Sequence, residues 1–322
     1  MRTLKSFLNT TILLFTKRIL VSLKTLRSLE EQKAFSEHLL KLTKSELEQV
    51  IAAHKLLEER IESLISENSD NQKVIAGLDF DLFYTKKRNH LLNLLFSQEV
   101  KMDMKIFCAQ NLEFSTSQLL QDLIAGYLQQ SSGFFCEIGG ADGIRLSNTY
   151  FLESKLNWKG IIAEPAFCFR SELMNNRKAF LSFDCVFSIS GQTLTFNETS
   201  DPFLSTISSF SSNDIHSTLR DDGKSVSYQV ETISLNDLLK FYSAPKYIDY
   251  LSIDTEGSEY EILKAFDFSQ YTFGFISVEH NYSELRAKIH DLLVQEGYTR
   301  VLSEISMWDD YYISKELLSN FR

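Results

Sequence analysis

Between residues 133 and 314, short apolar runs alternate with stretches whose apolar residues recur every three or four positions. A short run that is apolar throughout is typical of a strand buried on both faces, and the recurrence is typical of helices. Strands that alternate with helices pair in parallel through right-handed crossovers, which predicts a doubly wound α/β domain. The last two strands have no helix between them, so we expect an antiparallel edge pair. The predicted strands are residues 133–138, 159–164, 179–188, 250–254, 273–279, 299–305 and 310–314, and the predicted helices are residues 147–156, 167–177, 234–242, 259–266 and 283–295.

The N-terminal part of the chain has a different pattern. We divide the sequence into an N-terminal helical region (1–72), a helical connector (73–110) and the α/β domain (111–322). Residues 1–29 predict a basic amphipathic helix, which binds either an anionic membrane surface or an apolar protein face. Residues 40–68 carry heptad spacing, which indicates a coiled coil with a second copy of the chain or another helix. Packing of this helix on the α/β domain is the alternative.

The composition restricts which cellular compartment and which binding partners fit this chain. The net charge of −10 argues against a nucleic-acid substrate, because an acidic surface repels phosphates. The four cysteines form no CxxC pair, which favours free thiols in a reducing cytosol over a zinc cluster or a disulfide framework. No apolar run is long enough to span a bilayer. We therefore predict a cytoplasmic protein, with residues 1–29 as the candidate for peripheral contact with the inner face of the membrane.

The stretch "FFCEIGGADG" ends the first predicted strand of the α/β domain with an acid and then three glycines. Gly139, Gly140 and Gly143 allow a sharp turn and a close approach of the backbone to a ligand. The spacing fits neither the dinucleotide fingerprint G-x-G-x-x-G nor a phosphate-binding P-loop. Glu137 and Asp142 would repel a phosphate and suit a ligand with a cationic or ammonium end.

Acids also end the next two predicted strands or lie within them. Glu164 follows the glycines by about 20 residues, where an acid commonly accepts hydrogen bonds from ribose hydroxyls. Asp184 lies on the third strand, where a carboxylate can meet an adenine amino group. A ribose, an adenine and a cationic tail together describe S-adenosylmethionine (SAM). The order and spacing of these acids therefore predict SAM as the cofactor.

From about Phe114 onward the chain resembles the FkbM-type SAM-dependent methyltransferases. The resemblance implies a Rossmann-like class I methyltransferase sheet. Two positions depart from the family's usual glycine loop, since Glu137 stands in place of Asp and Ala141 in place of Asn. The segments that carry the resemblance are "STSQLLQDL", "GFFCEIGGADG", "SNTYFLE", "WKGIIAEPA", "VETISLNDLL", "IDYLSIDTEGSEYEILKAF" and "FISVEHN".

The resemblance also implies roles for single residues of this chain. Glu137, the glycines at 139, 140 and 143, and Asp142 would hold the methionine end of the cofactor. Glu164 would bind the ribose and Asp184 the adenine. The residues that would line or close the same pocket are Gln118, Asp122, Ser147, Asn148 and Thr149.

Methyl transfer to a hydroxyl needs an aligned acceptor and a base. His280 is the predicted base because its ordinary pKa is near neutral; a hydrogen-bonded structural histidine is the alternative. Asp254 is expected to contact the methionine ammonium or the acceptor, and Glu279, at the end of the neighbouring strand, is a further candidate for the catalytic base. Glu256 and Glu259 fit a helix N-terminus. We predict a site without a metal, although Asp254, Glu256, Glu279 and His280 offer ligands suited to magnesium or manganese.

The resemblance points to O-methylation of a hydroxyl on a sugar, a glycan or another secondary metabolite. The alternative is a coiled-coil interaction protein whose methyltransferase-like domain binds a nucleotide without catalysis. The acceptor itself has no recognisable signature in the sequence.

Overall fold

The computed structural model describes residues 72–129, 131–210 and 225–321. The chain divides into two compact units, Met1–Asn89 and His90–Arg322. The division falls inside the first described helix, whereas the sequence suggested limits at residues 72 and 110. The predictions for residues 1–29 and 40–68 lie outside the described residues.

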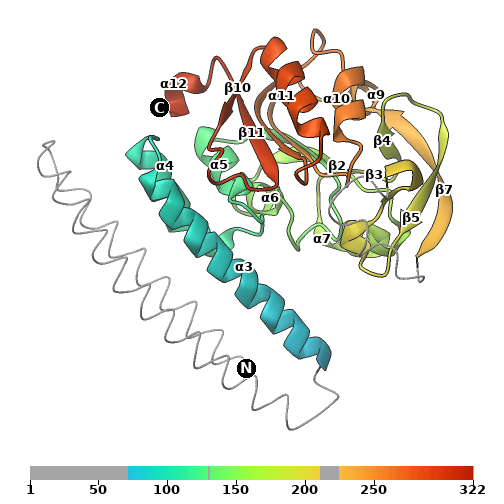
Figure 1. The fold of residues 1–322 in the computed structure, drawn as a ribbon, viewed down its shortest axis with the longest axis horizontal. Coiled ribbons are helices and arrows are strands. Elements are labelled where there is room, and N and C mark those ends of the chain that lie inside the picture. The colour runs from blue at the N-terminus through green and yellow to red at the C-terminus, as the bar shows by residue number, and fades with distance from the viewer. Residues whose placement is uncertain (1–71, 130, 211–224, 322) are drawn as a thin grey trace, which may run out of the picture. The chain divides into compact units, whose positions relative to one another are not determined.

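The second unit contains a seven-stranded sheet with the strand order β10-β11-β9-β8-β1-β2-β3 (Figure 1). β1, β2, β3, β8 and β9 are parallel, and β11 is antiparallel to both of its neighbours. The predicted doubly wound sheet with an antiparallel edge pair is therefore confirmed. Its strands are β1 (Phe134–Ile138), β2 (Lys159–Ala163), β3 (Phe180–Ser182), β8 (Tyr247–Ile253), β9 (Thr272–Glu279), β10 (Tyr298–Val301) and β11 (Asp309–Ser314).

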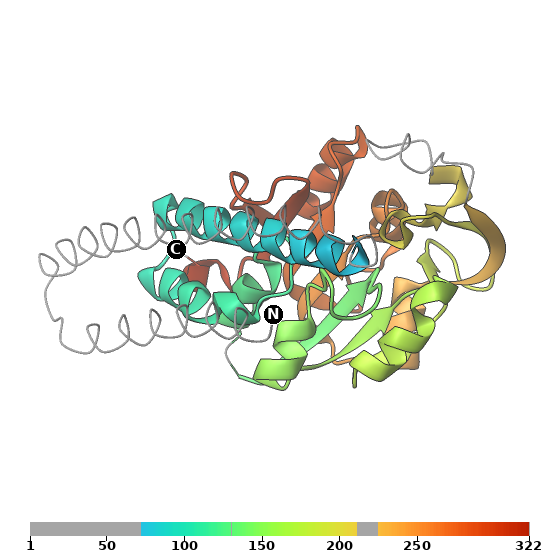
Figure 2. The same cartoon turned by 90° about the horizontal axis from the view of Figure 1, so that it is seen from below.

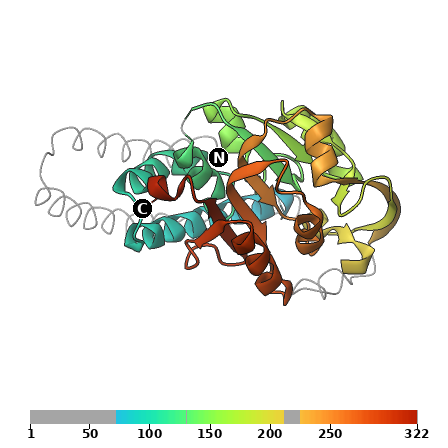
Figure 3. The same cartoon turned by 90° about the horizontal axis from the view of Figure 1, so that it is seen from above.

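Helices cover the two faces of this sheet, as Figures 2 and 3 show from below and above. The predicted connector is observed as α3 and α4, and the helices predicted after it are each found within a few residues of their expected bounds. Among the residues that the structure describes, no helix has both the length and the apolar character needed to cross a membrane. The helices are α3 (Gln72–Ser97), α4 (Met102–Asn111), α5 (Gln121–Leu128), α6 (Tyr150–Leu156), α7 (Arg170–Asn176), α9 (Leu235–Phe241), α10 (Glu259–Ala265), α11 (Leu285–Gln295) and α12 (Leu318–Phe321).

Alternate residues of each central strand enter two separate cores, because successive side chains of a strand point to opposite faces. Phe135, Tyr250 and Phe275 pack with α4, α5 and α6 in the first core. The neighbouring residues Cys136 and Leu251 pack with α9, α10 and α11 in the second. Burial on both faces explains why these strands read as continuous apolar runs in the sequence.

A second, four-stranded sheet lies beside the main one and corrects one prediction. Residues 179–188, expected as one strand, form β3 in the main sheet and β4 in the second, and the chain changes sheets at Phe183 and Asp184. The strand order is β4-β7-β5-β6, and β5 pairs antiparallel with β7. The strands of this sheet are β4 (Cys185–Phe187), β5 (Thr193–Glu198), β6 (Thr206–Ile207) and β7 (Val226–Ser234).

Candidate active site

Four residues form one row across the carboxyl ends of the parallel strands. The last residues of β2, β1 and β8 are in register, with Ala163 beside Ile138 and Ile138 beside Ile253. Ile253 in turn lies beside Val278 of β9. The next residue on each strand therefore continues the row, and these residues are Glu164, Gly139, Asp254 and Glu279. In doubly wound sheets, ligands bind outside this edge.

The glycine loop is shaped by contacts within the protein. Gly139 has φ +88°, and a Cβ built there would lie 1.8 Å from the carbonyl oxygen of Asp254. A Cβ on Gly140 would lie 2.2 Å from a methyl group of Ile162. Glycine is required at both positions because the loop lies directly against β8 and β2, which brings bare backbone to the strand ends.

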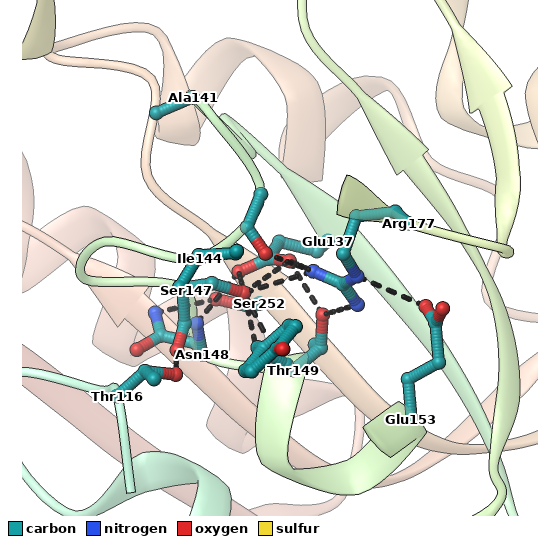
Figure 4. Close-up of polar contacts among 12 residues, drawn as sticks. Thr116, Glu137, Ala141, Ile144, Ser147, Asn148, Thr149, Glu153, Arg177 and Ser252 are labelled. Atoms are coloured by element: carbon teal, nitrogen blue, oxygen red, sulfur yellow. Dashed lines mark hydrogen bonds and ion pairs between the residues drawn. The ribbon is translucent and has the colours of Figure 1, made fainter. Parts of the chain in front are cut away.

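Glu137 is buried in β1, and its carboxylate is bound by protein groups (Figure 4). It accepts hydrogen bonds from the Asn148 backbone N–H (2.7 Å) and from the hydroxyls of Ser147 (3.1 Å) and Thr149 (2.5 Å). The guanidinium of Arg177 lies 3.5 Å from the same carboxylate. Burial raises the pKa of Glu137, whereas Arg177 and the hydrogen bonds lower it. In this arrangement Glu137 fixes the loop after the glycines; its predicted contact with the methionine end stays a prediction.

Arg177 connects the glycine loop to α6 and has no counterpart among the residues predicted from the sequence. Its Nη1 donates to the carbonyl of Gly143 and to the Ser147 hydroxyl, both at 3.0 Å. Its Nη2 donates to Thr149 (2.8 Å) and its Nε to Glu153 of α6 (2.9 Å). Figure 4 shows the guanidinium between the carboxylates of Glu137 and Glu153. Basic residues after a short helix, here Arg177 and Lys178, give no local signal of such a role.

Asn148 presents an unsatisfied acceptor at the same edge. Its amide nitrogen donates to the Ser252 hydroxyl of β8 (2.9 Å), but its Oδ1 is buried and has no hydrogen-bond partner. Buried polar atoms are nearly always paired, so an unpaired oxygen points to a missing donor. Ser147 lies beside Asn148 with its hydroxyl on Glu137.

Two of the predicted carboxylates bind backbone N–H groups. Glu164 accepts from the backbone N–H groups of Ala141 and Ala166, both at 2.8 Å, and burial raises the pKa of Glu164 to about 7. Asp142 accepts from the next turn of the loop, at Ile144 and Arg145. Asp184 is half-buried at the point where the chain changes sheets.

The segment before α5 contacts the glycine-loop region. Thr116 donates to the backbone carbonyl of Ser147 (2.9 Å), and Ser117 forms a β-bridge with Leu146. Asp122 is fully buried and accepts from Ser115 and Ser117, so its carboxylate stabilises this turn. Gln118 lies in the same turn and is half-buried. The prediction that these residues close over the cofactor stays a prediction.

About half of this chain matches a known protein family. Residues 137–300, about half of the chain, match the family model described as the methyltransferase FkbM domain. The chain belongs to the FkbM methyltransferase family. Membership implies SAM as the cofactor, and the matched range contains the whole row of strand ends. A search of curated proteins gives no match.

Three solved structures with some similarity to this FkbM-family chain share 15% identity or less with it. The methyltransferase FkbM of Methylobacillus flagellatus KT has 10% identity and a TM-score of 0.37, with coverage of 75% of this chain and 60% of that one. The precorrin-6y C5,15-methyltransferase of Geobacter metallireducens GS-15 has 15% identity and a TM-score of 0.33, with 62% and 88% coverage. The CurJ carbon methyltransferase has 9% identity and a TM-score of 0.30, with 80% and 70% coverage.

Three carboxylates converge at the ends of β8 and β9 in this family member. Oxygens of Asp254, Glu256 and Glu279 lie within 4.8 Å of one another. At 4.8 Å two ionised carboxylates repel by about 3.5 kcal/mol at an effective dielectric constant of about 20. Burial raises the pKa of both Asp254 and Glu279, and the charge of Asp254 raises the pKa of Glu279 further. Glu259, in contrast, accepts from the backbone N–H groups of Thr255 and Gly257, as expected for an acid at a helix start.

His280 is held by two hydrogen bonds, which argues against the predicted role of base. Its Nε2–H donates to the carbonyl of Asp309 (3.0 Å), and its Nδ1 accepts from the backbone N–H of Tyr282 (3.0 Å). Burial lowers the pKa of His280 to about 4. Neither nitrogen has a lone pair left for a substrate proton, so the alternative of a structural histidine fits the geometry.

Proposed function

We propose that this chain transfers a methyl group from SAM to a hydroxyl group of a sugar, a glycan or another secondary metabolite. The observation that carries the proposal is the row Glu164, Gly139, Asp254 and Glu279 at the carboxyl ends of four neighbouring parallel strands of an FkbM-family domain. The glycine loop, the acid proposed to bind the ribose (Glu164) and the two carboxylates proposed to face the acceptor (Asp254 and Glu279) meet at this edge.

Binding of SAM uses the Glu164 end of the row together with the neighbouring loops. The ribose hydroxyls donate to Glu164, each of whose oxygens accepts one hydrogen bond from the residues that the structure describes. The methionine ammonium supplies the donor that the buried Oδ1 of Asn148 lacks. Asp184, in the turn between β3 and β4, accepts from the adenine amino group. The bare backbone at Gly139 and Gly140 lets the cofactor lie between these groups.

Methyl transfer is an in-line displacement in which the protein mainly aligns the acceptor. The bond between methyl carbon and sulfur breaks, and its electron pair stays on sulfur, which becomes a neutral thioether. A bond forms between the methyl carbon and the acceptor oxygen, and the hydroxyl proton passes to water. Asp254 and Glu279 hold the acceptor so that a lone pair of its hydroxyl oxygen points toward the methyl group. Hydroxyl acceptors fit this edge because its side chains are hydrogen-bond acceptors.

Titration calorimetry of the full chain with SAM tests the cofactor part of the proposal. We expect one SAM per chain and at least tenfold weaker binding by Asn148→Ala, because the variant lacks the unpaired Oδ1. Asn320→Ala is the control, since Asn320 is exposed near the C-terminus, and it should bind SAM as the wild type does. Absence of SAM binding by the wild-type chain would overturn the proposal.

Mass spectrometry tests the acceptor. Extracts of sugars, glycans and secondary metabolites are incubated with SAM and the protein, and the products are searched for the mass of one added methylene. Nuclear magnetic resonance of the product then tells whether the new methyl group is bonded to oxygen or to carbon. A carbon-bonded methyl group would contradict the O-methylation proposed here.

A further inference from the structure

The carboxylate cluster at the ends of β8 and β9 is built from two segments of the chain. Asp254 follows β8, Glu256 lies in the next turn with φ +58°, and Glu279 ends β9. Register holds Asp254 and Glu279 side by side, because Ile253 pairs with Val278. Asn281 donates its side-chain amide to Glu256 (3.3 Å), which holds that carboxylate toward the other two. The oxygens offered by the three acids lie within 4.8 Å of one another.

A second observation points to a missing ligand at this cluster. Glu279 is only 5% exposed, and its Oε2 is a buried acceptor without a hydrogen-bond partner. Within the described ranges of the chain, no Lys, Arg or His forms an ion pair with Asp254 or Glu279. Buried carboxylates are normally paired with a cation or coordinate a metal. The described residues therefore provide no positive partner for the ionised form of Glu279, which shares a hydrogen bond with Asp254 of the same cluster.

The donor atoms select the kind of cation. All three are carboxylate oxygens, which suit the hard ions magnesium and manganese. Both nitrogens of the adjacent His280 are already hydrogen-bonded, so no imidazole joins the set. Glu279 also lines a small, partly open pocket together with Gly257, Glu259 and Asn281. Magnesium usually keeps several waters, and this pocket leaves space for water or for ligand oxygens.

We propose that Asp254, Glu256 and Glu279 bind one divalent cation, magnesium or manganese, which in turn coordinates the acceptor hydroxyl. This inference rests on the proposed function for the role of the cation, but not for its binding. The cation would lie next to Asp254, whose backbone contacts Gly139 of the glycine loop. Coordination makes a hydroxyl more acidic, so its proton leaves to water more easily as the oxygen receives the methyl group.

Manganese binding by the full chain, freed of metal with a chelator and without SAM, tests the inference. Calorimetry and electron paramagnetic resonance should report one Mn²⁺ per chain. Glu279→Gln and Asp254→Asn each keep the side-chain shape but remove a charged ligand, so each should weaken Mn²⁺ binding at least tenfold. Glu304→Gln is the matched control, because Glu304 is exposed and lies outside the cluster, and its affinity should equal that of the wild type.

Failure of this inference can be told apart from failure of the proposed function. No Mn²⁺ binding by the wild-type chain, or equal binding by Glu279→Gln, overturns the cation site even where SAM still binds. SAM binding that weakens tenfold in Asp254→Asn, without any Mn²⁺ binding, overturns it too, because the methionine ammonium would then be the positive partner. A rise of the wild-type melting temperature with Mn²⁺ supports the site without recourse to the variants.

Discussion

Replacement of Arg177 by methionine tests the network that holds the glycine loop. The change keeps an unbranched side chain of moderate length and removes the guanidinium, which bonds four groups of the loop and of α6. It leaves the buried Glu137 carboxylate without its cation. The side chain of Arg177 itself is 0% exposed, so solvent does not replace the lost charge.

The expected loss of stability is large for one residue. Removal of one partner of a buried ion pair costs about 3–5 kcal/mol, because an unpaired charge stays in the interior. For a domain of about 150–250 residues this corresponds to a fall in melting temperature of roughly 6–20 °C. Arg300→Met is the matched control: Arg300 is 35% exposed and lies 3.5 Å from Asp310, so its ion pair should contribute no more than about 1 kcal/mol.

The pH dependence of the stability provides a second test of the pairing between Arg177 and Glu137. Burial raises the folded-state pKa of Glu137 even with Arg177 present, and without Arg177 the pKa rises further. A carboxyl group with a raised folded pKa loses stability as the pH rises from its unfolded pKa, about 4.3, through the folded value. The deficit of Arg177→Met should therefore be larger at pH 8 than at pH 5.

Urea unfolding followed by circular dichroism at both pH values measures the effect. In a Glu137→Gln background, Arg177→Met should cost less, because the uncompensated charge is gone. The reasoning is refuted if Arg177→Met costs no more than Arg300→Met, or if its cost is the same with and without Glu137.

Three further predictions concern the loop, the ribose acid and the histidine. Gly139→Ala should destabilise the chain by more than Gly297→Ala. Each substitution costs about 1–2 kcal/mol because the backbone has a positive φ. Only the Cβ at position 139 would also clash, 1.8 Å from the Asp254 carbonyl oxygen, whereas nothing lies within 4 Å of a Cβ at position 297. Equal unfolding midpoints for the two variants would contradict this. Glu164→Ala should weaken SAM binding at least tenfold, or about 1.4 kcal/mol, in calorimetry, and unchanged affinity would remove Glu164 from the ribose site. His280→Leu should lose roughly 1–3 kcal/mol of stability through two broken hydrogen bonds and leave SAM affinity within about twofold; weaker SAM binding at unchanged stability would contradict a structural role.

Local pattern was enough to predict four of the five parallel strands, β1, β2, β8 and β9, and the positions where they end. Residues 133–138 and 250–254 read as continuous apolar runs because both faces of β1 and β8 are covered by helices. The carboxylates at the strand ends were predicted for the same reason, since parallel strands bring their carboxyl ends to one edge. The glycines at 139 and 140 were predicted to face a ligand, and the structure adds that packing against β8 and β2 also requires them.

Pattern could not reveal how buried groups pair across the fold. Arg177 and Glu137 are 40 residues apart, and no local sequence pattern near either residue predicts that they pair. The two hydrogen bonds of His280 likewise depend on Asp309 of β11 and on a tight turn at Tyr282. From the sequence, only the ordinary pKa of a titratable residue is known. Its hydrogen-bond partners in the fold decide whether it can act as a base or has a structural role.

The sequence by itself determined the α/β class, the order of the strands along the chain and the family, because buried strands, helices and turns each have a recognisable local residue pattern. Only the tertiary structure decided that residues 179–188 serve two sheets and that Arg177 lies against Glu137. Strand register and chain reversal bring these groups together, and neither leaves a trace in the spacing of residues along the chain.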